Sequence, residues 1–380
     1  MRPAVIVDAV RTPIGARGGR LSGWHPADLA AEVLRALADR TGLDPATVDD
    51  VVLGCAMPVG NQAFNVARSA VLAAGWPEGV PAGTVDRQGT SGLAAVIDAA
   101  RAVASGACEV VVAGGVEVMS TTPQGATLVP GSMPFGPGVT DRYRAAGGLI
   151  PAGVAAEALA ASLGLDRAAL DAVALRSHAQ AAVGAELVPV ASRALDRDKG
   201  EVVRSGTMVA IDELARPGLT LEALAAARPA FDPEGVVTAA NSAGIGDGAA
   251  GVLVMSEAAA AALGHRPLAV VRATAVVGSD PLATFGGAAV AAARVGAAGI
   301  DVGRFEVGEP FAAALVAFVR ALDLDPAIVN PAGGGIALGE PTGATGARLV
   351  ATLVHGLNGP GVAAIGGLGG LGAAILLDPA

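Results

Sequence analysis

Apolar residues follow two patterns along the chain, and together these predict alternating strands and helices. Continuous apolar runs begin at Ala4 (AVIVDAV) and at Leu268 (LAVVRATAV), and each is typical of a buried strand. The segment 89–115 reads as a glycine turn, a helix with periodic apolar residues, a glycine break and another buried strand. Such alternation predicts an α/β fold with mostly buried sheets and helices on their faces.

The helix–strand unit occurs a second time near the end of the chain, at 343–367 (GATGARLVATLVHGLNGPGVAAIGG). The spacing from Gly92 to Gly114 is 22 residues and that from Gly346 to Gly366 is 20, so the two units have nearly the same length. We interpret this as an internal duplication. Between the copies, 121–148 is rich in glycine and proline and predicts loop, whereas 154–182 and 219–227 predict helices. Three domains are predicted. They are the N-terminal half at 1–119, an inserted loop domain with the return to that half at 120–245, and the C-terminal half at 246–380.

Composition excludes several classes of protein. The 380 residues are 52% hydrophobic, enough for two fused core units. A net charge of −10 with Lys199 as the only lysine argues against a nucleic-acid partner. The N-terminal residues do not resemble a signal peptide and no apolar run is long enough to cross a membrane, so we expect a cytoplasmic protein without a membrane partner. Cys55 and Cys108 have no metal-ligand spacing, so neither a metal site nor a disulfide is expected.

The segment 330–348 (NPAGGGIALGEPTGATGAR) resembles the thiolase signature N-x-x-G-G-x-I-A-x-G-H-P-x-G-x-[ST]-G-x-R. Further similar segments are VDAVRTPIGARGG, GNQAFNVARSAVLAAG, AGGVEVMS and GVVTAANSAGIGDGAA. On these motifs the chain is identified as a member of the thiolase superfamily. The resemblance implies a duplicated fold with two five-stranded mixed sheets, helices in layers (α-β-α-β-α) and an inserted loop domain. It also implies a homodimer or higher oligomer, and an active thiolase-like subunit is a second candidate partner.

Four positions that carry reactive side chains in the family differ here. TVDRQGTSG places Gly89 at the nucleophilic cysteine, and GEPFA places Gly308 at the asparagine that holds a water. Glu340 stands at the histidine. The C-terminal loop places Gly366 at the second cysteine, or Ala364 if the register is two residues earlier. The resemblance therefore implies a degenerate site at which the side chains for acyl-cysteine chemistry are missing.

The same alignment predicts the surroundings of this site. Backbone donors for an oxyanion are expected at Gly89, Gly369 and Gly370. Ala243 stands at the position of a CoA-contacting serine, and Ser242 lies one position earlier, so CoA or an acyl-CoA is a candidate ligand at these two residues; no cofactor is required. In the acyl-pocket loop, Thr284 replaces a methionine and Phe285 a glycine. The predicted pocket residues are Thr90, Ser91, Thr284, Phe285, Glu309 and Phe311.

Two interpretations of function remain open from sequence. In the first, the protein lacks ordinary thiolase activity and is a non-catalytic acyl-thioester-binding or scaffold subunit. In the second, it is an unconventional acyl-CoA-dependent acyltransferase, hydrolase or C–C lyase that uses a backbone oxyanion hole and Glu340 as a general base, because a carboxyl group in an apolar pocket gains a raised pKa. The alternative role for Glu340 is a carboxylate that faces solvent or pairs with an arginine. The first interpretation is the one that we predict.

Overall fold

The computed structural model describes residues 2–380 and contains a continuous ten-stranded sheet, whose two halves are related by the predicted duplication and are called the first and second sheets below. The first sheet has the order β4 (Ala82–Val85), β3 (Asp50–Gly54), β5 (Val110–Val118), β8 (Gly246–Ser256) and β1 (Ala4–Arg11). Strands β4, β3 and β5 are parallel, whereas β8 is antiparallel to both of its long neighbours. The short β2 (Gly15–Ala16) extends β8 at its edge. This is a mixed sheet of five main strands.

The second sheet repeats this plan in the order β10 (Arg304–Val307), β11 (Gly361–Gly367), β12 (Leu371–Pro379) and β9 (Ala269–Gly278). Its fifth member is reduced to a parallel bridge between Val329 and Phe305, at the place that β4 takes beside β3. Strands β1 and β9 pair through Val5 and Ile6 and so link the two sheets. The predicted duplicated, mixed α/β fold is confirmed.

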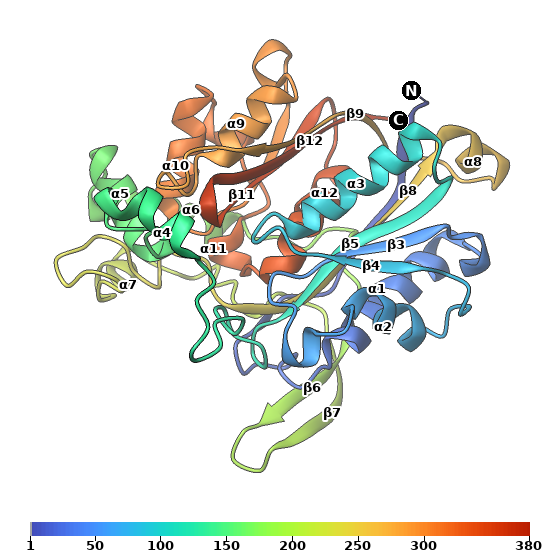
Figure 1. The fold of residues 1–380 in the computed structure, drawn as a ribbon, viewed down its shortest axis with the longest axis horizontal. Helices are drawn as coiled ribbons and strands as arrows, with labels where there is room; N and C mark the ends of the chain where they lie inside the picture. The colour runs from blue at the N-terminus through green and yellow to red at the C-terminus, as the bar shows by residue number, and fades with distance from the viewer. Residues whose placement is uncertain (1) are drawn as a thin grey trace.

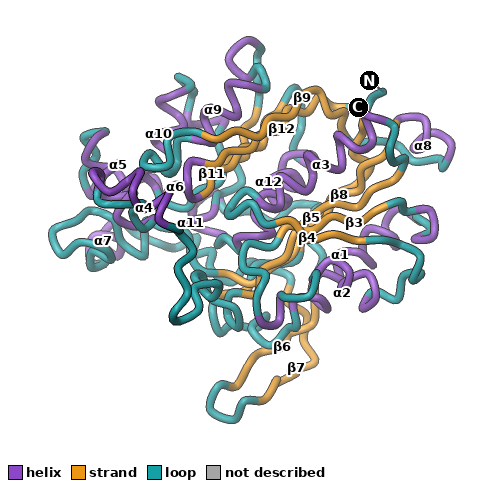
Figure 2. The backbone as a smooth tube through the Cα atoms, in the orientation of Figure 1, coloured by secondary structure: helices purple, strands orange, loops and turns teal. Residues whose placement is uncertain are grey.

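Helices form three layers around the two sheets (Figures 1 and 2). The central layer is α3 (Ser91–Ser105) with α12 (Thr342–His355), and residues 343–354 of α12 are all buried. A helix that is apolar on all sides belongs in the interior. The outer layers are α1 (Pro26–Thr41) with α2 (Val66–Ala73), and α9 (Gly287–Arg294) with α10 (Ala312–Ala321).

Glycines allow the two central helices to touch at their N-terminal ends. A Cβ on Gly92 would lie 2.6 Å from the carbonyl oxygen of Gly343, and one on Gly346 would lie 2.3 Å from the Leu93 nitrogen. Neither position has room for a side chain, so the repeated glycines seen in the sequence place the N-terminus of α3 against that of α12.

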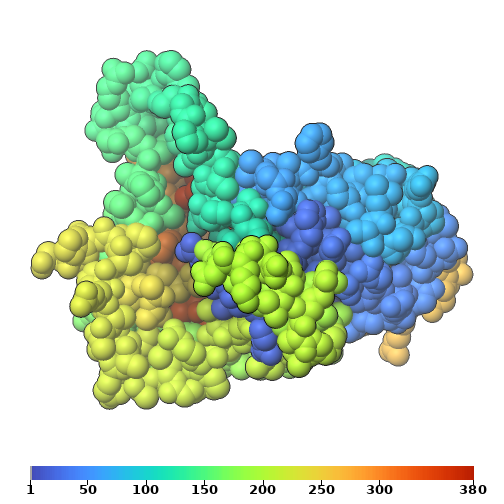
Figure 3. Space-filling model, turned by 90° about the horizontal axis from the view of Figure 1, so that it is seen from below, coloured from blue at the N-terminus to red at the C-terminus, as the bar shows by residue number. Residues whose placement is uncertain are grey.

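The inserted segment contains α4 (Pro137–Tyr143), α5 (Ala152–Ser162), α6 (Arg167–Gln180), α7 (Leu221–Ala225) and the hairpin of β6 (Val190–Asp196) and β7 (Glu201–Val209). Figure 3 shows its green and yellow atoms around a hollow in which red atoms of the C-terminal half are visible. The remaining helices are the short α8 (Glu257–Ala262) and α11 (Gly335–Leu338).

The predicted boundary at residue 246 lies too early, because β8 pairs with β1 and β5 and belongs to the first half. No helix within residues 2–380 is long and apolar enough to cross a membrane.

A buried ion network ties the inserted segment to β1. Arg11 is 1% exposed; its Nη1 and Nη2 donate to Asp212 at 2.7 and 3.0 Å, and its Nε donates to Glu186 at 3.3 Å. Asp212 also accepts the Ile14 N–H at 2.8 Å. Each charge is therefore paired and hydrogen-bonded, as burial requires.

Replacing Asp212 with Ala is expected to lower the free energy of unfolding by about 3 to 5 kcal/mol, because it leaves the Arg11 guanidinium buried with only one carboxylate. Urea unfolding followed by circular dichroism measures this change. Asp198→Ala, in the exposed turn of the β6–β7 hairpin, is the control and should change stability by less than about 0.5 kcal/mol. Equal stability of the two variants would contradict a structural role for the network.

Candidate functional site

A cavity of about 640 Å³ opens where the N-termini of α3 and α12 meet the inserted segment. Three of the four altered positions line it: Gly89, Glu340 and Gly366. Gly308 does not line the cavity, but Pro310 and Phe311, which follow it, do. The tertiary structure thus brings together positions that lie up to 277 residues apart in the sequence (366 − 89).

Gly89 and Gly366 face each other across the inner end of the cavity. A Cβ on Gly89 would lie 3.1 Å from the carbonyl oxygen of Gly366 and 4.0 Å from the Thr342 methyl carbon. Ala364 lies two residues earlier in the same strand, β11, but it is packed in the apolar core and does not line the cavity. This geometry decides the register in favour of Gly366.

Ile365 fills the space next to Gly308. A Cβ on Gly308 would lie 2.7 Å from Cγ1 of Ile365, which is 3% exposed and lines the cavity. An asparagine at Gly308 would therefore collide with Ile365. Sequence reasoning missed Ile365, because an isoleucine in an apolar strand carries no signal of a role at a site.

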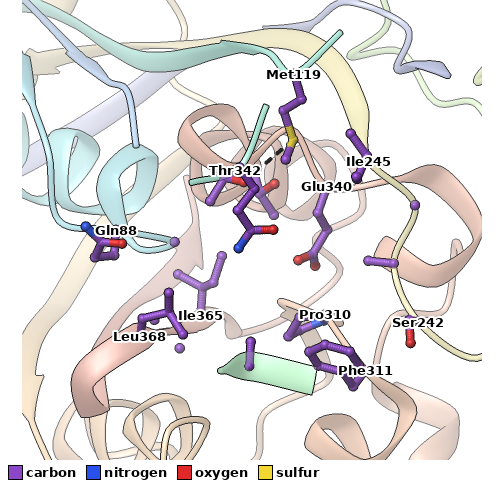
Figure 4. A pocket seen from close by; sticks show the side chains of 18 of the residues that line it. Gln88, Met119, Ser242, Ile245, Pro310, Phe311, Glu340, Thr342, Ile365 and Leu368 are labelled. Carbon is purple, nitrogen blue, oxygen red and sulfur yellow. Dashed lines mark hydrogen bonds between the residues drawn. The ribbon is translucent and has the colours of Figure 1, made fainter. Parts of the chain in front are cut away.

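Glu340 points into the cavity from the turn between α11 and α12 (Figure 4). Its Oε1 accepts the Glu309 N–H at 2.6 Å, and its own N–H donates to the carbonyl of Gly244 at 3.0 Å. Burial raises the pKa of Glu340; the Glu309 N–H bond and the positive charge of Arg348 oppose that rise. Among residues 2–380 it is the only acidic residue that lines the cavity, and Arg348 is the cation whose charge acts on it.

A second carboxyl group, that of Glu309, is buried next to Glu340. Oε2 of Glu309 accepts the hydroxyl of Ser177 at 2.7 Å and the N–H of Ile336 at 3.0 Å, and the residue is 2% exposed. Burial, with a smaller contribution from the charge of Glu340, raises the pKa of Glu309 to about 7. Glu309 does not itself line the cavity and reaches it through the N–H that it donates to Glu340. The sequence could not reveal this pair, since the two residues are 31 positions apart.

Three predicted pocket residues are instead structural. The hydroxyl of Thr90 donates to the carbonyl of Arg87 at 2.7 Å, and that of Ser91 donates to Gln88 at 2.6 Å. Both bonds close the turn before α3. Thr284 is buried and its hydroxyl donates to Pro281 at 3.3 Å. None of the three is among the residues that line the cavity, although Thr90 packs next to Gly367, which does.

The remaining predicted positions divide between cavity and scaffold. Phe285, Phe311, Ser242 and Ala243 line the cavity. The Ser242 hydroxyl donates to the carbonyl of Thr238 at 2.7 Å. Gly369 and Gly370 do not line it; the glycine loop contributes residues 366–368 instead. Gly369 and Gly370 belong to the short turn Leu368–Gly370 that leads into β12 at Leu371, and an oxyanion contact from them stays a prediction.

Neither native cysteine belongs to the site. Cys55 is buried, its thiol donates to Glu117 at 3.6 Å, and burial followed by the charge of Glu117 raises its pKa above the ordinary value. Cys108 precedes β5, and burial raises its pKa as well. Both thiols are therefore poor nucleophiles near neutral pH.

Comparison with known proteins identifies relatives along the whole chain. The family model of the thiolase N-terminal domain matches residues 4–258 and that of the thiolase C-terminal domain matches 265–379. The 3-ketoacyl-CoA thiolase FadA of Escherichia coli (strain K12) is 40% identical over 372 residues, which cover 93% of this chain and 92% of the relative. The peroxisomal 3-ketoacyl-CoA thiolase 2 of Arabidopsis thaliana is 39% identical over 363 residues, covering 92% and 77%.

The crystal structure of the Bacillus anthracis acetyl-CoA acetyltransferase is also similar, with a TM-score of 0.86, 35% sequence identity and coverage of 100% of this chain and 99% of that one. These matches contradict the sequence-based prediction of a protein without ordinary thiolase activity. Relatives that match over 77 to 92% of their own length carry the name 3-ketoacyl-CoA thiolase. The prediction of a non-catalytic subunit is therefore corrected.

Proposed function

Because the chain belongs to the thiolase family, we propose that it is an enzyme that cleaves a 3-ketoacyl-CoA between C2 and C3 with the thiol of CoA as acceptor. The substrate class comes from the names of its relatives. The observation that supports activity in this chain is the cavity of about 640 Å³ into which the carboxylate of Glu340 points. A large apolar cavity with one titratable group of shifted pKa is typical of an active site.

The altered positions determine how the reaction would proceed. Neither Gly89 nor Gly366 offers a thiol, so the CoA thiol itself attacks the C3 carbonyl while Glu340 accepts its proton. The C2–C3 bond then breaks, its electron pair moves to C2, and C2 receives the proton from Glu340. The products are an acyl-CoA, shortened by two carbons, and acetyl-CoA, and the enzyme is unchanged.

The direct test incubates the purified protein with acetoacetyl-CoA or a longer 3-ketoacyl-CoA and free CoA, and quantifies products by mass spectrometry. A longer 3-ketoacyl-CoA should give the shortened acyl-CoA and acetyl-CoA in equal amounts, and acetoacetyl-CoA should give two acetyl-CoA. These products support the proposal if they form only when CoA is present. Release of a free carboxylic acid without CoA would show that water is the acceptor. If none of these CoA thioesters were turned over, enzyme activity would be contradicted.

The pH dependence of turnover should reflect the two neighbouring carboxyl groups. Glu340 must be ionised to accept a proton, and since burial raises its pKa, activity should increase with pH through that raised value. Ionisation of Glu309, with a pKa of about 7, should add an inflection near that pH. A profile of kcat/KM between about pH 5 and 9 measures both. The inflection near pH 7 should disappear in Glu309→Gln; its persistence there would contradict the assignment.

We also propose that two copies of the chain associate through the edge of the first sheet. Strand β4 ends the strand order, and Phe64 next to it is 99% exposed. The side-chain amide of Asn65 donates to the carbonyl of Ala82 in β4 at 2.9 Å and so fixes the position of this edge. A free strand edge beside an exposed aromatic side chain favours pairing with a second chain.

Replacing Phe64 with Asp should therefore convert a dimer into a monomer, measured by light scattering after size exclusion. Phe135→Asp is the matched control, since Phe135 is also exposed but lies in the inserted segment. A wild-type protein that is monomeric at micromolar concentration would contradict the proposal.

A further inference from the structure

A second cavity, of about 420 Å³, shares no lining residue with the site described above. It is formed by β1, the C-terminal ends of α1 and α12, and the turn between α8 and β9. Four basic side chains and one acidic side chain line it: Arg40, His265, Arg266, His355 and Asp8. Two of the chain's four histidines are thus in one place, in a protein whose net charge is −10. We call this cavity the basic groove.

Arg40 and His355 are held by the one carboxylate of the groove. Nε of Arg40 donates to Asp8 at 2.7 Å. Nε2 of His355 lies 2.8 Å from the carbonyl oxygen of Ala9 and 3.5 Å from Oδ1 of Asp8. Burial lowers the pKa of His355, but the hydrogen bonds to Asp8 and Ala9 outweigh burial and raise it. Two cationic groups therefore share a single carboxylate.

The same two side chains also offset the charge of helix ends. Helix α1 ends at Thr41 and α12 ends at His355, and the last carbonyl groups of a helix carry partial negative charge. Arg40 and His355 lie in these last turns. Their positive charge is therefore largely used within the protein, and by themselves they do not indicate a ligand.

His265 and Arg266 have no comparable role in the protein. The ion pairs and side-chain hydrogen bonds of residues 2–380 include neither of these side chains. Their backbone is nevertheless fixed, because the His265 N–H donates to the carbonyl of Ala260 at 2.8 Å and the Leu268 N–H donates to that of Ile6 at 2.8 Å. An ordered turn thus presents two basic side chains at the groove without a protein partner.

The unused donors suit a phosphate group. An arginine guanidinium presents its N–H groups in a planar fork that matches two oxygens of a phosphate. Arg266 offers this fork beside a histidine, and Arg40 and His355 add positive charge nearby. In an acidic protein, such a concentration of basic groups attracts anions locally. A volume of about 420 Å³ is within the range of small-molecule sites.

The basic groove lies far from the first cavity. Helix α12 connects them, since Thr342 at its start lines the first cavity and His355 at its end lines the groove. A rise of 1.5 Å per residue places these two residues about 20 Å apart. Residues 343–354 between them are buried in the core. A ligand in the groove would therefore not overlap a substrate in the first cavity.

From this arrangement we propose that the basic groove binds a small molecule that carries a phosphate or diphosphate group, at a site separate from the cavity of Glu340. Arg266 and His265 donate to the phosphate oxygens, and Arg40 and His355 contribute positive charge. The inference does not depend on the proposed function, because it concerns other residues and requires no turnover.

The experiment is isothermal titration of the purified protein with inorganic pyrophosphate at low ionic strength, where charge attraction is least screened. We expect saturable binding with one pyrophosphate per chain. Arg266→Ala should weaken it about 10-fold or more, because a two-pronged contact between charged groups is lost. His265→Gln should weaken it about threefold. Both variants should keep the wild-type melting temperature, since neither side chain has a partner in the described residues.

Arg294→Ala is the matched control, because Arg294 is an exposed arginine at the end of α9 that lines neither cavity. It should leave pyrophosphate affinity within about twofold of wild type. Equal weakening in Arg266→Ala and Arg294→Ala would show diffuse attraction and overturn the inference. The absence of binding up to about 10 mM pyrophosphate would overturn it as well.

A second titration in the presence of saturating acetyl-CoA separates the groove from a site for the phosphates of CoA. Pyrophosphate affinity should change by less than about twofold, because the two cavities lie about 20 Å apart. Displacement of pyrophosphate by acetyl-CoA would overturn the inference. If pyrophosphate binds through Arg266 but no 3-ketoacyl-CoA is cleaved, the inference stands and only the proposed function fails.

Discussion

Replacing Glu340 with Gln is expected to reduce kcat by about 100- to 10,000-fold, the usual contribution of a general acid–base residue. The amide has nearly the same shape as the carboxylate, and its oxygen can still accept the Glu309 N–H that Glu340 accepts at 2.6 Å. It cannot accept the proton of the attacking thiol. Steady-state kinetics with a 3-ketoacyl-CoA and CoA measure the loss.

Binding and stability should separate this effect from misfolding. Affinity for an unreactive acyl-CoA should change by less than about threefold, and the melting temperature should stay equal or increase, because a neutral amide is less costly to bury than a carboxylate. Glu234→Gln, an exposed glutamate of the inserted segment, is the control. Activity within tenfold of wild type in Glu340→Gln would exclude Glu340 as the base.

Replacing Gly89 with Cys should create a protein that is covalently acylated by acyl-CoA, a reaction that the wild-type chain cannot perform at this position. A Cβ there would lie 3.1 Å from the carbonyl oxygen of Gly366, so a shift of a few tenths of an ångström accommodates it. The new thiol would lie two residues before Ser91, where α3 begins, and a helix N-terminus favours the thiolate. The thiolate attacks the thioester carbonyl and releases CoA.

Intact-mass spectrometry after incubation with acetyl-CoA should show a gain of one acetyl group per chain in this variant only. Gly89→Ala supplies the same Cβ without sulfur and should remain unmodified, as should the wild-type protein with its buried Cys55. A folded Gly89→Cys variant that acquires no acyl group would mean that position 89 does not present its side chain to a bound thioester.

The sequence allowed the fold to be predicted in some detail because its signals are local. The buried strands that begin near Ala4 and Leu268, and the glycine-headed helices at 91–105 and 342–355, form where their patterns indicate. The repeated spacing of those units predicted the duplication. The boundary at 246 was misplaced, because only strand pairing shows that β8 belongs to the first sheet.

The candidate site was predictable only as a set of aligned positions. Motif matching found that Gly89, Glu340 and Gly366 share one site, and the cavity includes all three. It could not tell that the hydroxyls of Thr90 and Ser91 are used by the backbone of the turn before α3. It also led to a wrong conclusion about activity, which the similarity to named 3-ketoacyl-CoA thiolases contradicts.

By itself, the sequence determined the α/β class, the duplication and the four altered positions, because periodicity and motif spacing are properties of the linear chain. Only the tertiary structure decided that Ile365 fills the space at Gly308, that Glu309 supports Glu340, and that Phe231, Phe285 and Phe311 meet. These relations join residues far apart in sequence. They depend on how sheets, helices and the inserted segment pack, and no local pattern carries that information.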